Sequence, residues 1–342
     1  METYQLLTGQ RRRIRRGIAV MAIIGALVVA AFVFSMNVGY TPLTPVEVIT
    51  TLFGMGTDKQ SLVLFEFRLP RIVIAILAGA GLAVSGCILQ GVSRNALADP
   101  GILGINAGAG LFVMLVVSLF PSLPIGSIFL LPLLALLGSG LAALLVYAFA
   151  YKRHEGISPT RLVLAGIAVA AGINAAMIVL TLRLNPEKYQ FVATWLAGSI
   201  WGSNWKYVLA LLPWICLLLP YVYSKARALD VLNLGEQTAA GLGAPVEKER
   251  LALLASAVGL AGTSVAVSGG IGFIGLIGPH LARRLVGPQH RLLLSTSALT
   301  GSLLLIVADT IGRWILEPSE IPAGIVAAVI GAPYFLYLLA RR

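Results

Sequence analysis

The stretch GGIGFIGLIGPHLAR, residues 269–283, decides the fold of this 342-residue chain. It is apolar, yet it is rich in glycine and interrupted by Pro279, so any helix formed there must be short or broken. A broken helix at membrane depth is tolerated only where its free backbone groups are buried in protein or line a water-filled path. The stretch therefore predicts an interior segment of a membrane protein that does not face lipid.

The composition around this stretch is that of a membrane protein. Hydrophobic residues make up 58% of the chain and charged residues only 11%. A soluble domain of this length cannot bury so much apolar surface, so the excess must face lipid. The first predicted span covers residues 16–36, about the length that crosses a bilayer. A signal peptide is the alternative, but the apolar run is too long and no A-x-A-like site follows it, which favours a retained anchor.

Nine further apolar runs follow, each bounded by charges or by Pro/Gly clusters. They cover residues 72–90, 104–120, 128–151, 162–182, 207–223, 251–267, 271–285, 292–311 and 323–340. We therefore expect an all-α integral membrane protein with about ten transmembrane helices, forming one domain over residues 1–342. Residues 269–285 make its broken eighth span.

The net charge of +11 could suggest nucleic-acid binding, but its distribution favours orientation in a membrane. If the N-terminus is cytoplasmic, 18 of the 25 Lys and Arg residues fall on that side. The positive-inside rule then predicts that both termini are cytoplasmic and that no nucleic acid is bound. The cytoplasmic positions include Lys152, Lys225 and Arg291, and the external ones include Lys59 and Lys188.

Catalytic and metal-binding motifs are missing from the sequence. It has no P-loop, no nucleophile elbow and no metal-ligand cluster, and Cys87 and Cys216 fall within spans. Asp309 is the one acid inside an apolar run, and Arg313 lies one turn further, so an i,i+4 ion pair is expected. An ion-coupled secondary transporter would keep more carboxylates or histidines at mid-membrane, so that class is the weaker alternative. A structural scaffold is a third possibility. No metal and no cofactor are predicted.

The second span carries a stripe of small residues at every fourth position. The stripe consists of Ala75, Gly79, Ala83, Cys87 and Gly91. Helices in lipid associate where small residues let backbones approach closely, so this face predicts a tight helix–helix contact.

Nine sequence blocks, in order, resemble one family over nearly the whole chain. They are RLPR (68–71), GAGLAVSG (79–86) with Gln90, RNALADPGILG (94–104), RLVLAG (161–166), WLAGS (195–199), the stretch 269–283, AD (308–309) with Arg313, EIPAG (320–324) and GAP (331–333). The chain resembles the FecCD-type permease subunits of type II ABC importers, which carry ferric siderophores, haem or cobalamin. It departs from that pattern at Ala96 and Gly278, where the family has proline and an aliphatic residue.

The resemblance implies the type II ABC importer permease fold and a set of partners. These are a second permease subunit, identical or paralogous, two cytoplasmic ABC ATPase subunits, an extracytoplasmic substrate-binding protein and the lipid bilayer of a prokaryotic cell membrane. The chain itself is then not an enzyme, because the partner subunits hydrolyse ATP. A ferric siderophore is the expected cargo, with haem and cobalamin as alternatives.

The loop of residues 228–246 is expected to contact the ATPases through two short helices, as the resemblance implies. Its own sequence supports local structure, because Asp230 or Asn233 can cap a helix and glycines permit sharp turns. An ordinary solvated loop is the alternative. The candidate coupling residues are Leu229, Asp230, Leu232, Gly235, Glu236, Gly241, Leu242 and Gly243.

Three arginines match the family positions that dock the binding protein: Arg68, Arg71 and Arg313. Snorkelling of long cationic side chains at helix ends is the alternative. The sequence TPVE at residues 44–47 reads as a capping box with proline at the first helical position, which predicts a short external helix.

The resemblance also marks a gate and a path. Ser158, Pro159 and Thr160 match the cytoplasmic gate of the family, and Asn174 of the fifth span is expected to face the transport path.

Overall fold

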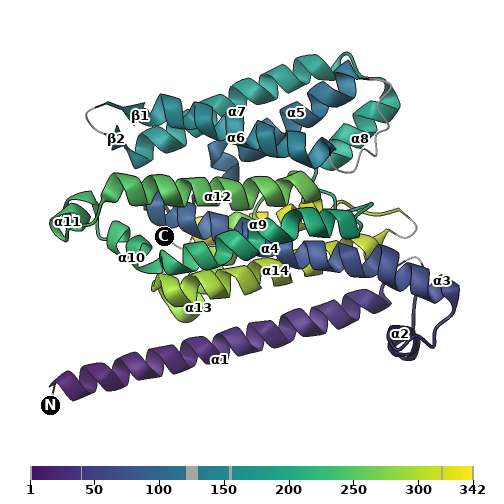
Figure 1. The fold of residues 1–342 in the computed structure, drawn as a ribbon, viewed down its shortest axis with the longest axis horizontal. Helices are drawn as coiled ribbons and strands as arrows, with labels where there is room; N and C mark the ends of the chain where they lie inside the picture. The colour runs from purple at the N-terminus through teal and green to yellow at the C-terminus, as the bar shows by residue number, and fades with distance from the viewer. Residues whose placement is uncertain (1, 40, 121–129, 154–155, 317–318, 341–342) are drawn as a thin grey trace.

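The computed structural model describes residues 2–39, 41–120, 130–153, 156–316 and 319–340, and Figure 1 shows a bundle of helices. The membrane-length helices run roughly along the long axis of the molecule. Their bounds are α1 (Glu2–Asn37), α4 (Leu69–Ser93), α5 (Ile105–Leu119), α6 (Leu130–Ala150), α7 (Pro159–Thr181), α9 (Trp205–Ser224), α12 (Val246–Ser268), α14 (His290–Ile315) and α15 (Ala323–Ala340). The shorter elements are α2 (Pro45–Leu52), α3 (Asp58–Ser61), the π-helix η1 (Leu62–Arg68), the 3-10 helix η2 (Pro100–Leu103), α8 (Pro186–Leu196), α10 (Ala226–Asn233), α11 (Glu236–Gly241) and α13 (Ile274–Val286).

The prediction of an all-α membrane protein with about ten spans is confirmed. In the described part of the chain, seven helices are long and apolar enough to cross a membrane, and α5 and the start of α15 are shorter apolar helices. The broken helix α13 completes the set of ten. Residues 128 and 129, which begin the predicted fourth span, lie outside the described residues.

The only paired strands among the described residues were not predicted. β1 (Tyr151–Lys152) and β2 (Gly156–Ile157) form a two-residue antiparallel ladder between α6 and α7. They lie at the same end of the molecule as α10 and α11, whereas α2, α3 and α8 lie at the other end (Figure 1). The loops predicted to face opposite sides of the membrane therefore gather at opposite ends.

Helix α4 lies at the centre of the bundle, and its small residues explain why. It packs against α12, α13 and α14, and a Cβ atom at Gly79 would collide with the carbonyl of Gly301 in α14. Ala75, Ala83 and Cys87 are also buried. The predicted tight contact along this stripe is confirmed, because only small side chains allow the two backbones to approach so closely.

The second span begins much earlier than residue 72. α3, η1 and α4 form one continuous helix over Asp58–Ser93. Pro70 has no amide hydrogen to donate, and the segment before it adopts the wider π geometry, with Leu69 N bonded to Leu64 O. Charges at Arg68 and Arg71 suggested a membrane boundary, but both side chains fold inward instead.

The break in the eighth span lies at the glycines rather than at Pro279. Residues 269–273 are not helical, Phe273 has a φ of +66°, and α13 then continues through Pro279. The proline leaves the carbonyl of Gly275 without its usual donor, and this carbonyl lies against Gly86 of α4. The first turns of α13 are largely buried, at Ile274, Gly275, Ile277, Gly278 and Pro279, as an irregular segment at membrane depth requires.

Candidate functional site

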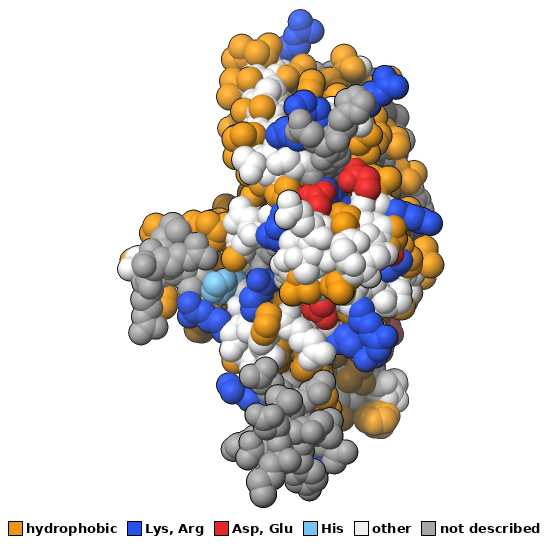
Figure 2. Space-filling view, turned by 90° about the vertical axis from the view of Figure 1, so that its left-hand side faces the viewer, with side chains coloured by type: hydrophobic (Ala, Val, Ile, Leu, Met, Phe, Trp, Pro, Cys, Tyr) orange, Lys and Arg blue, Asp and Glu red, His pale blue; other side chains and the backbone are white. Residues whose placement is uncertain are grey.

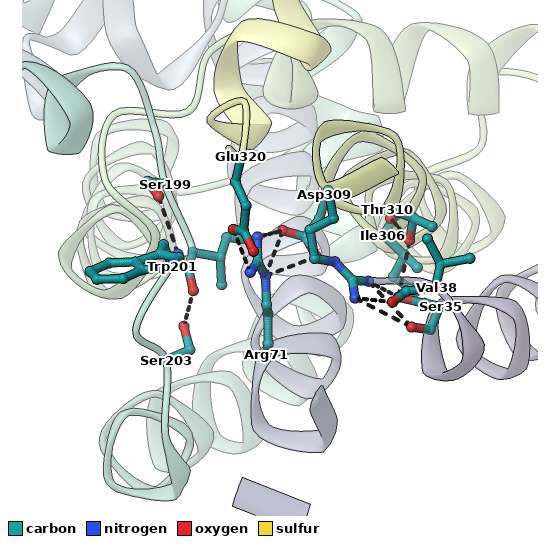
Figure 3. A network of polar contacts seen from close by, with 12 residues as sticks. Ser35, Val38, Arg71, Ser199, Trp201, Ser203, Ile306, Asp309, Thr310 and Glu320 are labelled. Atoms are coloured by element: carbon teal, nitrogen blue, oxygen red, sulfur yellow. Dashed lines mark hydrogen bonds and ion pairs between the residues drawn. The ribbon is translucent and has the colours of Figure 1, made fainter. Parts of the chain in front are cut away.

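A network of charged side chains joins the first turn of α4, the last turns of α14 and the segment before α15, as Figure 3 shows. These parts lie towards the end of the molecule that carries α2 and α8 (Figure 1). Arg71 of α4 is its centre. Its Nε lies 2.9 and 3.1 Å from the two carboxylate oxygens of Asp309, and its Nη2 lies 2.8 Å from Asp309 Oδ1. Its Nη1 lies 2.8 Å from Glu320 Oε2. The guanidinium of Arg71 therefore binds two carboxylates, that of Asp309 in α14 and that of Glu320 in the segment before α15.

Asp309 is shared between two arginines. Its side chain is only 2% exposed, and Arg313 Nε lies 3.2 Å from its second oxygen. This confirms the predicted i,i+4 pair, but the stronger bidentate partner is Arg71. A buried carboxylate held by two guanidiniums is fully occupied and has no free face for a coupling ion.

Arg68 and Arg313 bind the C-terminal end of α1, where helical carbonyls lack intrahelical donors. Arg68 donates to the carbonyls of Met36 and Thr41, and Arg313 donates to the carbonyl of Val38 at 2.9 Å. Cations are favourable at a helix C-terminus because its dipole is negative there. Both side chains are 5% exposed. These two arginines thus fasten α1 to α4 and α14.

The predicted docking arginines therefore differ in how they are used. Arg68 and Arg313 are buried against α1, and neither presents a free guanidinium to solvent. Arg71, 12% exposed, reaches the surface only beside Glu320. Docking remains a prediction for all three, and the geometry favours Arg71. Glu320 lies in the EIPAG block of the sequence, but no sequence signal pairs it with Arg71, 249 residues away.

Three backbone segments meet close to this network. The carbonyl of Trp195 accepts from Gly270 N at 3.2 Å, and the carbonyl of Gly198 accepts from Gly324 N at 2.9 Å. Gly198 has a φ of +80°, and a Cβ atom at Gly324 would collide with the carbonyl of Ala197. The end of α8 with the residues that follow it, the segment before α13 and the start of α15 are therefore joined through backbone atoms.

At the opposite end, the loop of residues 228–246 forms α10 and α11, so the prediction of two short helices is confirmed. Gly235 and Gly243 have φ values of +108° and +79° and make the turns before and after α11. Leu229 and Leu232 are buried, while Leu242 is 64% exposed. Leu234, another leucine of this loop, is 61% exposed.

The capping prediction for this loop is wrong. Asp230 lies inside α10, Asn233 is its last residue, and Gly235 precedes α11 without a side-chain bond. Asp230 Oδ1 instead accepts from the backbone N of His290 at 3.0 Å and lies 2.7 Å from its Nδ1. Asp230 therefore caps α14 from a distant segment, which local sequence cannot reveal.

One ion pair attaches the same loop to α12, because Arg250 of α12 lies 3.3 Å from Glu236 of α11. Arg250 also lies 3.5 Å from Glu247 within α12, and Lys225, just before α10, lies 2.8 Å from Glu249 of α12. The hydrogen bond from Lys225 to Glu249 raises the pKa of this lysine. Figure 2 views this end and shows Lys and Arg side chains spread over it.

The predicted gate and path residues lie on α7. Ser158 precedes α7, Pro159 is its first residue, and Thr160, three residues after β2, is exposed. Asn174 is exposed on the same helix, about 21 Å further along its axis. The structure does not bring Asn174 together with the other three residues. The described residues contain no group of three or more side chains that could hold a metal ion.

These features define a multi-pass helical membrane protein with a closed charge network at one end and an exposed helix pair at the other. The chain belongs to the FecCD transport family, which it matches over residues 19–341.

Known proteins and a solved structure agree with this family. The chain is 49% identical to the iron(3+)-hydroxamate import system permease protein FhuG of Bacillus subtilis, over 97% of this chain and 99% of that protein. It is 39% identical to the hemin transport system permease protein HmuU of Yersinia pestis, over 90% of this chain and 91% of that protein. A solved inward-facing structure of a metal-chelate type ABC transporter has 31% identity and a TM-score of 0.82, and covers 95% of this chain and 99% of that one.

Proposed function

We propose that this chain is the membrane permease subunit of an ATP-driven ABC importer for a ferric siderophore. The observation that carries the proposal is the full-length similarity to an iron(3+)-hydroxamate permease. Haem is the second candidate cargo, supported by the similarity to a hemin permease. Haem is the weaker candidate, because the chain is 39% identical to the hemin permease and 49% identical to the iron(3+)-hydroxamate permease.

Ion-coupled transport is disfavoured by the site itself. Asp309 is the acid that such a mechanism would use, and Arg71 and Arg313 already neutralise it. The sequence has no P-loop either, so the proposal assigns ATP hydrolysis to two partner ATPases in the cytoplasm.

The helices α10 and α11 are the proposed contact with these ATPases. Leu234 and Leu242 expose apolar side chains there, and burying them against a partner subunit would remove apolar surface from water. Asp230 connects the loop to α14, and the ion pair of Glu236 with Arg250 connects it to α12, so movement of the loop would reach membrane-spanning helices.

The remaining parts of the proposal follow from the arrangement of the two ends. Arg71 is the proposed docking point for an extracytoplasmic binding protein, and a second permease subunit completes the path along α7, with Ser158, Pro159 and Thr160 at its cytoplasmic gate and Asn174 facing it. The chain is placed in a prokaryotic cell membrane with both termini in the cytoplasm.

Uptake into proteoliposomes tests the function directly. The complete importer, with its ATPases and binding protein, is reconstituted and supplied with a radiolabelled ferric hydroxamate. We expect uptake only when ATP is present on the ATPase side. Uptake driven by an ion gradient without ATP would contradict the proposal, and uptake of haem alone would change the cargo.

A further inference from the structure

The two carboxylates bound to Arg71 are held very differently. Asp309 is 2% exposed and fixed by Arg71 and Arg313 together. Glu320 is 33% exposed and pairs with Arg71 Nη1 at 2.8 Å through one carboxylate oxygen. Part-exposed ion pairs contribute little free energy, whereas removing one member of a buried pair is strongly destabilising. Glu320 is therefore the partner that can be replaced.

We propose that the outer face of Arg71 is a carboxylate-exchange site. Before docking, Glu320 occupies Nη1 of the guanidinium, and a carboxylate of the binding protein displaces it when that protein binds. This inference rests on the proposed docking role of Arg71 and adds the internal competitor.

Charge supports a carboxylate as the incoming group. The ion pairs themselves balance, with the guanidiniums of Arg71 and Arg313 against the carboxylates of Asp309 and Glu320. The guanidinium of Arg68 lies next to that of Arg313, on the other side of Gly39, and has no carboxylate partner among these groups, so the five side chains together keep a formal excess of one positive charge. Such an excess attracts an acidic side chain and raises the rate of encounter.

Geometry restricts the exchange to Arg71. Arg68 and Arg313 donate to the carbonyls at the end of α1, and Gly39 lies between them, where a Cβ atom would lie 3.5 Å from the Arg68 side chain and 3.6 Å from that of Arg313. Withdrawing either arginine would leave helix-end carbonyls without donors. Moving Glu320 away from Arg71 leaves only a solvent-accessible carboxylate, which water can solvate.

The exchange also provides a connection to the path. Glu320 begins the segment that leads into α15, where Ile321 N bonds to Gly312 O at 3.0 Å and Gly324 N bonds to Gly198 O at 2.9 Å. Displacing Glu320 releases a side-chain tether of this segment beside the junction of α8, α13 and α15. Docking would thereby loosen the outer end of α15.

Binding of the importer's own binding protein to the complete importer in nanodiscs tests the exchange. We expect Glu320→Gln to tighten binding about two- to fivefold, because the internal competitor is lost, and mainly through faster association. Glu187→Gln is the matched control. It removes one exposed negative charge at the start of α8, on the same end of the molecule, without touching Arg71. Glu320→Asp, with a shorter reach and the same charge, should tighten binding less, and it replaces Glu320→Gln if that variant does not assemble.

Arg71→Gln separates this inference from the docking proposal. If Arg71→Gln weakens binding at least tenfold while Glu320→Gln leaves it unchanged or weaker, docking stands and the exchange is wrong. If Glu187→Gln tightens binding as much as Glu320→Gln, the effect is general electrostatics and the exchange is also wrong. If Arg71→Gln binds normally, the docking role itself fails.

Discussion

The two ends of this molecule differ in whether their side chains are already paired within the chain. At one end Arg68, Arg71 and Arg313 are buried and satisfied by groups of the same chain. At the other end Leu234 and Leu242 expose most of their side chains at the surface of the subunit. An end with satisfied charges must exchange contacts when a partner arrives, whereas an end with exposed leucines can bind at once. The comparison suggests transient docking on one side and lasting attachment on the other.

Removal of the buried carboxylate of Asp309 should have the largest effect. Asp309→Ala leaves the buried Arg313 without its carboxylate and Arg71 with only the part-exposed Glu320, so we expect a loss of about 3–5 kcal/mol in stability. The melting temperature of the purified subunit in detergent measures it. Glu320→Gln, which removes the part-exposed partner, is the control and should change stability by less than about 1 kcal/mol. Equal melting temperatures for the two variants would show that the network is not structural.

The exposed leucines offer the next test. Leu242→Asp and Leu234→Asp should leave the fold intact, because both side chains are already in solvent. Each change should lower ATP-driven uptake at least tenfold, because it removes an apolar contact with the proposed ATPase partner. Gln237→Asp adds the same charge to α11 without removing a leucine, so its uptake should stay near that of the wild type. Normal uptake in both leucine variants would exclude Leu234 and Leu242 as part of the contact with the ATPase subunits.

The link between α10 and α14 is expected to give a smaller effect. Asp230→Ala leaves the backbone N and Nδ1 of buried His290 without their acceptor, which should reduce stability by about 1–3 kcal/mol. Hydrogen exchange should then rise in α10 and in the first turn of α14. Asp230→Asn keeps an acceptor for the backbone N and should be milder. Unchanged exchange in α14 after Asp230→Ala would contradict the link.

A pH titration of Asp99, whose carboxylate lies beside Gly275 of α13, should give the smallest effect. Burial raises the pKa of Asp99 to about 6, although the carboxylate accepts a hydrogen bond from Gly101 N at 2.8 Å. A raised pKa means that the folded state prefers the protonated acid, so stability falls as the pH rises through about 6. Asp99→Asn should therefore be more stable than the wild type above pH 7. The gain should be only about 1 kcal/mol, because the partial exposure of Asp99 to solvent screens the cost of its charge. This advantage should shrink as the pH falls towards 4.5, and a difference independent of pH would contradict the assignment.

Sequence could predict the features that depend on neighbours along the chain. The ten spans follow from local hydropathy, and the capping box at Thr44 is present as expected, with Glu47 bonded to the Thr44 backbone at 2.7 Å. The pair of Asp309 with Arg313 follows from helical periodicity.

The contacts that define the site were beyond that reach. Arg71 pairs with Asp309 across 238 residues, and Asp230 pairs with His290 across 60. Tertiary packing sets such pairs, and no periodic pattern encodes which charges will meet. The π-helix η1 was missed for a similar reason, because the charges beside Pro70 suggested a span boundary when packing turns them inward.

The proposed docking role of the Arg71 end and the proposed ATPase contact at α10 and α11 require that these two ends lie on opposite sides of the membrane. Single cysteines at positions 188 and 225, in a protein whose Cys87 and Cys216 have been replaced, can be labelled in intact cells with a membrane-impermeant thiol reagent. We expect labelling at position 188, beside the end with Arg71, and none at position 225, beside α10, until the membrane is permeabilised. Labelling of position 225 in intact cells would place Leu234 and Leu242 outside the cell and contradict their proposed contact with the ATPase subunits.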